Sequence, residues 1–316
     1  MTPNKKIIAS CWNNGVFVLG GSDLIHELPN RPVRGLSHDL DGGVLAIVDG
    51  QDVYQRKSSG QWKRIGRSKY DLSVTLAING NIYVGTDDAR VLTLGETGEL
   101  TQIDNFEAIE GRDTWFAGTA IINGREVGPP LGIRSFSGSR HGHLFANVHV
   151  GGIPRSDDGG VIWTPTINVD WDAHEVRVSP YDDNLVVAAT ASGLCVSHDG
   201  GNTWNLQTEG LHDPYCSAVA ITEKHIFVAA SEGHFTEKGA IYRRSVAPSS
   251  QPLEKLGSGL PEWLRGIADT SCIATDHDDM ALISTGGDVF VSQNAGHSWR
   301  KRGETIAGVS SVLIIR

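Results

Sequence analysis

Four histidines in this chain stand at the ends of short apolar runs, beside loops rich in glycine and acidic residues. The segments are ANVHVGG with His149, VDWDAHEV with His174, GLHDPYC with His212 and ASEGHF with His234. Histidine is the commonest metal ligand in proteins and the usual acid or base near neutral pH. If the loops meet, these imidazoles could hold a divalent metal ion (Fe, Cu, Mn or Zn) or act as metal-free acid–base groups. Each could also serve only its own loop backbone.

Four carboxylates accompany the histidines and are candidates for catalysis. They are Asp172, Glu175, Glu232 and Asp269. Carboxylates beside imidazoles can orient them for metal binding. A pair of carboxylates can instead hydrolyse a glycosidic bond, when the two carboxyl groups lie about 5–5.5 Å or 6.5–9.5 Å apart. Sequence spacing does not set that distance, so glycoside hydrolysis is a third functional candidate.

Arginines and aromatic residues near the same loops are candidates for binding a substrate. They are Arg34, Arg134, Arg112, Trp115, Tyr215 and Trp263. Two of them, Arg112 and Trp115, belong to the long segment 105–130. Loops beyond about 12–15 residues in a compact domain are usually lids, binding loops or disordered segments. The segment is apolar enough to pack down, so we expect a lid insertion there.

The pattern of apolar runs predicts a framework that brings separate loops together. Short β-like runs separated by Gly, Asn and Asp recur in sets of four, at 33–64, 73–104, 131–168, 174–207, 215–257 and 269–302. Residues 7–30 supply three further runs, and 308–316 supply one. We therefore expect an all-β, seven-bladed β-propeller, a single domain over 1–316, closed by the C-terminal strand pairing into the N-terminal blade. A six-bladed ring is the alternative.

One short motif occurs three times in the chain. SDDGGVIW begins at Ser156, SHDGGNTW at Ser197 and SQNAGHSW at Ser292. The acid and the hydroxyl suit a turn that hydrogen-bonds its own backbone, and the glycines permit positive φ. In the expected register each copy joins the third strand of a blade to the fourth. The other candidate residues then lie on the opposite face, around the channel mouth, and the motif itself is a structural turn.

These three copies resemble the Asp-box, or BNR repeat, of sialidases and related β-propellers, among them a photosystem II assembly factor. The resemblance implies the propeller fold. Sialidases bind a carboxylate with three arginines and carry an Arg-Ile-Pro-type motif, whereas this chain offers Arg34 and Arg134 without a convincing third and lacks the motif. Sialidase activity is therefore not expected. The assembly factors present a basic patch and are exported, and neither feature is found here.

The composition and charge of the chain limit the classes of partner that it can bind. The chain of 316 residues has a formal net charge of −10 and no basic run, so it lacks an electrostatic footprint for nucleic acid or an anionic membrane. The first residues have no apolar signal-peptide core and no stretch could span a membrane, so we expect a cytoplasmic protein. Cys11, Cys195, Cys216 and Cys272 lie in apolar runs without CxxC spacing, which favours buried free thiols.

Together these features predict an intracellular enzyme or a small-molecule-binding propeller with a histidine-rich site at the top of the channel. A non-catalytic interaction or assembly propeller is the second candidate. The expected partner is a small-molecule ligand or substrate, with no nucleic acid and no membrane.

Overall fold

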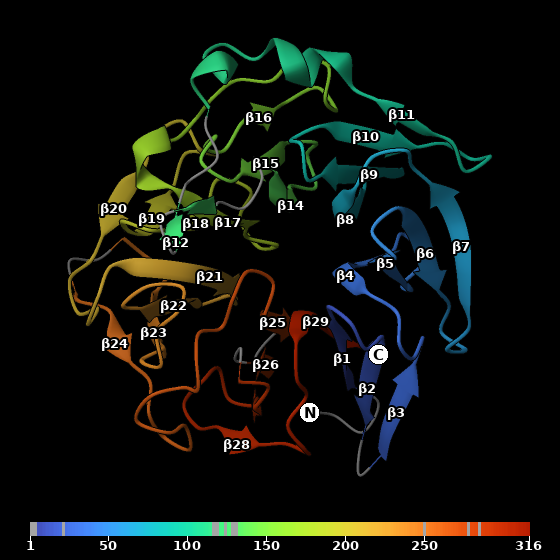
Figure 1. Ribbon diagram of the computed structural model, residues 1–316. Coiled ribbons are helices and arrows are strands. Elements are labelled where there is room, and N and C mark those ends of the chain that lie inside the picture. Colours follow the sequence, from blue (N-terminus) through green and yellow to red (C-terminus); the bar gives the residue numbers. More distant parts are fainter. Residues whose placement is uncertain are drawn as a thin grey trace.

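The computed structural model describes residues 5–20, 23–115, 120–122, 125–127, 132–248, 251–276, 279–283 and 286–316. Their strands form small antiparallel sheets arranged in a ring (Figure 1). One strand of each main sheet lies next to the centre of the ring: β29, β4, β8, β14, β17, β21 and β25. The chain therefore folds as an all-β propeller, as expected.

Six of the sheets in the described part have four strands each. The first contains β29 (Val309–Ile315), β1 (Lys6–Cys11), β2 (Val16–Gly20) and β3 (Asp23–Glu27). The next two contain β4 (Val33–His38), β5 (Val44–Val48), β6 (Asp52–Arg56) and β7 (Trp62–Arg67), and β8 (Leu72–Ile78), β9 (Asn81–Thr86), β10 (Val91–Leu94) and β11 (Leu100–Gln102). The fourth and fifth contain β17 (Ala173–Val178), β18 (Val186–Thr190), β19 (Gly193–Ser197) and β20 (Asn205–Gln207), and β21 (Tyr215–Ile221), β22 (His225–Ser231), β23 (Ala240–Ser245) and β24 (Glu254–Lys255). The sixth contains β25 (Ile273–Asp276), β26 (Asp279–Ile283), β27 (Val289–Ser292) and β28 (Arg300–Lys301).

A three-stranded sheet lies between the β8 and β17 sheets in the ring (Figure 1). It contains β14 (Ile133–Gly138), β15 (Leu144–Val148) and β16 (Arg155–Ser156), and an isolated bridge joins Arg155 to Thr164. The preceding connection holds the 3₁₀ turns η1 (Asp104–Ala108) and η2 (Arg112–Thr114) and the hairpin β12 (Ala120–Ile122) and β13 (Arg125–Val127). Within the expected lid 105–130, residues 116–119, 123–124 and 128–130 lie outside the described residues. No helix of the described part is long and apolar enough to cross a membrane.

The two ends of the chain meet in one sheet, as the sequence predicted. Strand β29 pairs antiparallel with β1, with Ile314 opposite Ile7 and Val312 opposite Ala9. These four side chains are all buried in one cluster with the neighbouring β25 sheet. The pairing leaves β1 with a partner on both sides, so the ring is closed by main-chain hydrogen bonds and a shared apolar core.

The second strand of several sheets is buried on both faces. Strands β5 (VLAIV), β15 (LFANV) and β18 (VVAAT) are buried at every position. They lack the polar alternation of a half-exposed strand because sheets pack on both sides of them. The four cysteines are also buried, and their thiols are free.

Side chains connect the innermost strands across the gaps between sheets. The Ser311 hydroxyl of β29 accepts a hydrogen bond from the backbone N–H of Leu36 in β4, at 3.1 Å. Between β14 and β17, the Ser135 hydroxyl accepts from the N–H of Val176 at 3.0 Å. An inner strand has no ladder partner on the channel side, so these bonds satisfy backbone groups that would otherwise be left unpaired.

The three Ser-x-Asp/Asn motifs form turns of one design after β16, β19 and β27. In the second copy the Ser197 hydroxyl accepts from the N–H of Gly201 at 2.8 Å, and Asp199 Oδ1 accepts from the N–H of Thr203 at 2.8 Å. Gly201 has φ +85°, and a Cβ there would lie 2.9 Å from Phe145 of the adjacent sheet. The motif is thus a turn that fastens neighbouring sheets, and glycine is required by both conformation and space.

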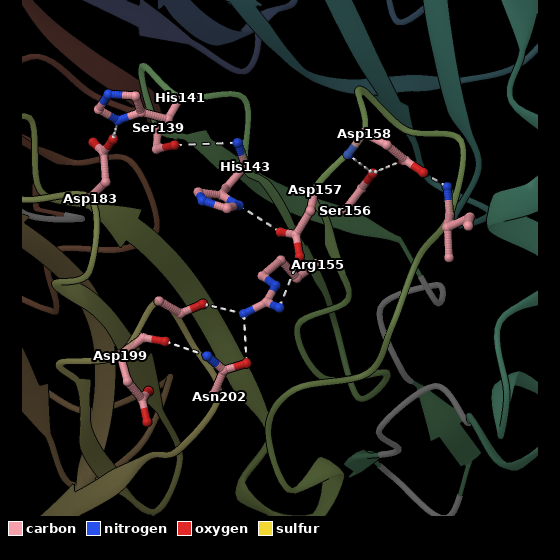
Figure 2. A network of polar contacts seen from close by, with 12 residues as sticks. Ser139, His141, His143, Arg155, Ser156, Asp157, Asp158, Asp183, Asp199 and Asn202 are labelled. Atoms are coloured by element: carbon pink, nitrogen blue, oxygen red, sulfur yellow. Dashed lines mark hydrogen bonds and ion pairs between the residues drawn. The ribbon is translucent and has the colours of Figure 1, made fainter.

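A polar network joins two of these turns across adjacent sheets (Figure 2). Arg155 donates to Asp157 at 2.9 Å within the first turn, and to Asn202 of the second turn at 3.0 Å. His143 Nδ1 lies 2.6 Å from Asp157 Oδ1. His141 Nδ1 contacts the carboxylate of Asp183, so both histidines already have partners on the face that carries the turns.

We predict that Asp199→Asn is nearly neutral, because Asn294 occupies the equivalent position of the third turn and accepts from the N–H of Ser298 at 2.9 Å. Asp199→Ala removes the acceptor and should lower the free energy of unfolding by about 1 kcal/mol, a low value because the carboxylate is exposed to water. Urea denaturation of both variants provides the measurement. Equal losses in the two would contradict the acceptor role.

Candidate functional site

A β-bulge near the start of β17 directs His174 toward the candidate site. The pairing with β18 passes from Ala173 opposite Thr190 to Glu175 opposite Ala189, so His174 is the extra residue. Bulges re-aim a side chain and are common next to binding sites. His174 Nδ1 lies 2.6 Å from the carbonyl oxygen of Cys216. Because a carbonyl only accepts, Nδ1 carries the hydrogen, and in the neutral tautomer the lone pair is on Nε2.

Asp172 is held in front of that lone pair by its own backbone. It ends the 3₁₀ turn η3 (Val169–Trp171) in the left-handed region, at φ 52°, which aspartate tolerates. Its N–H donates to Val169 and its carbonyl accepts from Ala191. The carboxylate Oδ2 lies 3.5 Å from His174 Nε2.

His149 completes this group from the neighbouring sheet, one residue beyond the end of β15. Its N–H donates to the carbonyl of Gly132, and its Nε2 lies 3.7 Å from Asp172 Oδ1. The residue is 6% exposed. Burial, with the positive charge of Arg134 nearby, lowers the pKa of His149 to about 4, so the ring is neutral at physiological pH.

The three side chains form a candidate metal centre. One ligand atom from each of His149, Asp172 and His174 lies within 4.8 Å of the others. Burial alone would raise the pKa of Asp172, but the hydrogen bond and charge of His174 outweigh it and hold that pKa below its ordinary value. Two imidazoles and one carboxylate with open positions are a donor set for divalent transition metals.

Unpaired polar atoms test whether a cation fits the group. Asp172 Oδ1 and His149 Nδ1 are both buried without a hydrogen-bond partner among the described residues. A carboxylate oxygen without a donor is costly to bury. A proton on His174 Nε2 would serve Oδ2 but would leave Oδ1 unpaired, whereas a metal ion would be attracted to all three side chains.

A cavity of about 240 Å³ opens at the centre of the ring. The three triad side chains do not line it, but two of its lining residues contact the triad: Gly132 accepts from the N–H of His149, and the Thr270 hydroxyl donates to the carbonyl of His174. Its charged and aromatic lining residues are Trp12, Arg34, Asp87, Arg134 and Asp269. Arg34 is paired with Asp87 at 2.5 Å, and its guanidinium lies over the ring of Trp12. Arg134 is half-buried and has no hydrogen bond or ion pair within the described part of the chain. Asp269 Oδ1 accepts from the N–H of Thr270 at 2.8 Å.

Tyr215 packs on His174 of the triad but does not itself line the cavity. Its ring centroid is 4.8 Å from that of His174. Burial, with the nearby charge of Asp269, raises the pKa of Tyr215 to about 12, so the phenol is neutral. The structure therefore groups His149, Asp172, His174, Arg134, Tyr215 and Asp269, all named from the sequence.

His212 and His234 do not join this group. His212 Nε2 lies 2.9 Å from the carbonyl of Lys238, and Nδ1 lies 2.7 Å from the hydroxyl of Tyr242, so both nitrogens have partners. His234 is exposed and contacts the ring of Phe235. Both lie in loops next to strands of the β21 sheet, and neither is among the residues that line the central cavity.

Several other candidate residues make contacts that stabilise the fold away from the triad. Glu232 is exposed and pairs with Lys238 at 2.8 Å. Trp263 lies under the ammonium of Lys255 and beside the ring of His212. In the described part of segment 105–130, Arg112 stacks on Trp115 and donates to the carbonyl of Ala89 at 3.0 Å.

Glu175 is the most completely enclosed of the four candidate carboxylates, at 0% exposure. Its Oε2 accepts from the N–H of Val219 at 2.8 Å, its Oε1 accepts from the N–H of Ser271 at 3.0 Å, and Arg177 pairs with it. Burial raises its pKa. These donors occupy the carboxylate, which ties three sheets together at the channel.

Trp12 and Asp87 line the cavity but were not identified from the sequence. Asp87 directly follows β9, on the same type of loop as His149 after β15. Applying the loop argument to every sheet would have found it. Trp12 directly follows β1, the second strand of its own sheet, so it lies on the same type of loop and the same argument would have found it.

Neither a protein-family model nor a curated protein matches this chain. Similar solved structures include the computationally designed Ika8 protein, at 11% identity and TM-score 0.61, with 98% of this chain and 92% of that chain covered. YCF48 from Cyanidioschyzon merolae has 12% identity and TM-score 0.59, over 90% of this chain and 95% of that one. An ancestral GH74 enzyme has 12% identity and TM-score 0.60, over 98% of this chain but 40% of its own. At these identities the likeness shows the β-propeller fold alone.

Removing the acceptor at Glu175 should destabilise the fold. Glu175→Ala leaves the N–H groups of Val219 and Ser271 and the charge of Arg177 without their partner, so we expect a loss of about 3–5 kcal/mol in the free energy of unfolding. Glu232→Gln, at an exposed glutamate, is the matched control and should leave stability unchanged. Chemical denaturation distinguishes them, and an equally small effect at Glu175 would argue against the structural role.

His149 should make the metal-free protein acid-sensitive. Its pKa in the folded state is about 4 against 6.5 for the free side chain, so the unfolded state binds the proton first as pH falls. The free energy of unfolding should therefore drop by up to about 3 kcal/mol between pH 6.5 and 4. His149→Gln should reduce this dependence, while His198→Gln, at an exposed histidine, should not. Denaturation across this pH range in chelator provides the measurement.

Proposed function

We propose that this propeller binds or transforms a small polar molecule at the channel mouth, with a divalent transition metal held by His149, Asp172 and His174. The observation that carries the proposal is the carboxylate of Asp172, which lies between two imidazoles and has its Oδ1 buried and unpaired. His149 is neutral, as a ligand must be, and the bond from His174 Nδ1 to Cys216 presents Nε2 toward the carboxylate.

A bound metal would supply Lewis acidity or an activated water at the edge of the cavity. The protein's own contribution is orientation and the exclusion of water. Arg134 and Asp269 offer a cation and an acceptor to the ligand, the neutral Tyr215 offers a hydroxyl, and Trp12 provides an aromatic surface. This combination suits a small molecule with both charged and hydrogen-bonding groups.

The test is metal binding by tag-free protein stripped with chelator and titrated with Co²⁺ or Mn²⁺. We expect one ion per chain, and a loss of affinity of more than about 100-fold in Asp172→Asn. His212→Ala, outside the triad, should bind as the wild type does. Near-UV circular dichroism shows whether each variant is folded. Wild-type protein that takes up neither ion would overturn the metal site.

A metal-free acid–base site is the second candidate, and the pairing of His174 with Asp172 at 3.5 Å favours it. In that case a proton on Nε2 replaces the metal, and the same variants would lose ligand turnover while chelator has no effect. For the interaction or assembly propeller, the second candidate from the sequence, changes at the triad would leave partner binding intact.

We also propose that the ring counts seven blades and that its three turns are Asp-boxes. The three-stranded sheet β14–β16 occupies a full place in the ring, and the bridge from Arg155 to Thr164 supplies a third pairing, at the position of a fourth strand. The six-blade alternative counts only the complete four-stranded sheets. The hydrogen bonds shared by the turns at Ser156, Ser197 and Ser292 support the Asp-box assignment.

A further inference from the structure

The bulge that directs His174 has an equivalent in the preceding sheet. Strand β14 pairs Ile133 with Val148 and then Ser135 with Asn147, so Arg134 is the extra residue there. Arg134 and His174 thus occupy the same position in adjacent inner strands. Arg134 lines the central cavity, and its charge acts on both His149 and Asp172.

Within the described residues, Arg134 is the charged cavity residue that most clearly needs a partner. The other guanidinium, that of Arg34, is already neutralised by Asp87. Arg134 is half-buried and makes neither a hydrogen bond nor an ion pair with any described residue. A partly desolvated guanidinium is stabilised by an oxyanion, and its planar fork matches a carboxylate with two parallel hydrogen bonds.

The charge balance of the mouth favours one negative charge in the ligand. Arg34 and Asp87 cancel, and so do Arg134 and Asp269, which leaves the charge of Asp172. A divalent ion at the triad would change the balance from −1 to +1. Inside a cavity of about 240 Å³, charges interact more strongly than in open water. The metal-loaded site therefore attracts a monoanion.

Asp269 and Tyr215 place a further requirement on the chemistry of the ligand. The carboxylate of Asp269 lines the cavity and accepts a hydrogen bond from the N–H of Thr270 through one of its oxygens. The neutral phenol of Tyr215 packs on His174 and is close enough to Asp269 to feel its charge. A ligand with a donor near its carboxylate satisfies these groups, whereas a dianion would be repelled by Asp269.

We propose that the cavity binds a small monocarboxylate that carries a hydroxyl or amino group, with its carboxylate on Arg134, and that this ligand and the metal bind cooperatively. The inference rests on the proposed function, because the cooperativity requires the metal. Coupling between two sites is reciprocal, so each ligand raises the affinity of the other by the same factor.

The experiment measures the affinity of the full chain for Co²⁺ with and without glycolate, and compares wild type with Arg134→Gln. Glycolate should tighten Co²⁺ binding to the wild type by about 10-fold, within the usual range of coupling. Glycolamide has the same shape without the charge and should have little effect. In Arg134→Gln the protein should still bind Co²⁺, and the coupling should fall below about 2-fold. Arg140→Gln, at an exposed arginine, is the matched control and should retain full coupling.

Three outcomes would overturn the proposal. Glycolamide could couple as well as glycolate, coupling could persist in Arg134→Gln, or inorganic phosphate could couple more strongly than glycolate. The last result would assign the cavity to phosphate esters or free phosphate.

The failure of the metal site is recognised separately. If the wild type binds no Co²⁺, the proposed function fails, and titration of metal-free protein with glycolate by calorimetry tests the anion site alone. Binding that is lost in Arg134→Gln would keep the carboxylate site and discard the cooperativity. Absence of glycolate binding in the metal-free wild type, after such a failure, would overturn the carboxylate site as well.

Discussion

The ring depends on one constraint: the backbone groups at the inner edge of each sheet must find hydrogen-bond partners. A strand at the channel has no neighbour on one side, so its backbone N–H and C=O groups need other partners. The chain supplies them from side chains of the adjacent sheet. Ser311 bonds to Leu36, Ser135 to Val176 and Glu175 to Val219. These contacts fix the height and rotation of neighbouring sheets, and the pairing of β29 with β1 closes the ring.

The same inner strands produce the site, because all of them except β25 have a register shift near their start. The extra residues in β14 and β17 are Arg134 and His174, and a further bulge in β21 falls at Ser217. A bulge turns a side chain that regular alternation would direct between the sheets. Chemically different residues at one structural position therefore meet around the channel mouth. The fold provides the position, and the residue type at each bulge decides what it can bind.

Residues 172–175 show that hydrogen-bond partners distinguish a candidate functional carboxylate from a structural one. Asp172 and His174 face each other at the edge of the cavity, where one carboxylate oxygen has no donor. Glu175, the next residue, is enclosed by two backbone donors and an arginine. The side chain of Glu175 is fully enclosed, whereas that of Asp172 is 32% exposed, and only Asp172 has unmet hydrogen-bonding capacity. An unpaired oxygen on a partly exposed carboxylate is what distinguishes the functional candidate from the structural residue.

The sequence by itself determined the features that depend on local chemistry. Alternating and continuous apolar runs defined the strand groups, the Ser-Asp-Gly-Trp spacing defined the turns, and the single strand at 308–316 indicated the closure. The same logic put His149, Asp172, His174 and Arg134 on loops and strand starts of one face. Only the tertiary structure decided which of these candidates meet. The ring nitrogens of His212 contact Tyr242 and Lys238, and the Glu175 carboxylate is enclosed between sheets. That outcome depends on bulges and on the register between strands far apart in the chain, and a shift of one residue reverses the direction of a side chain.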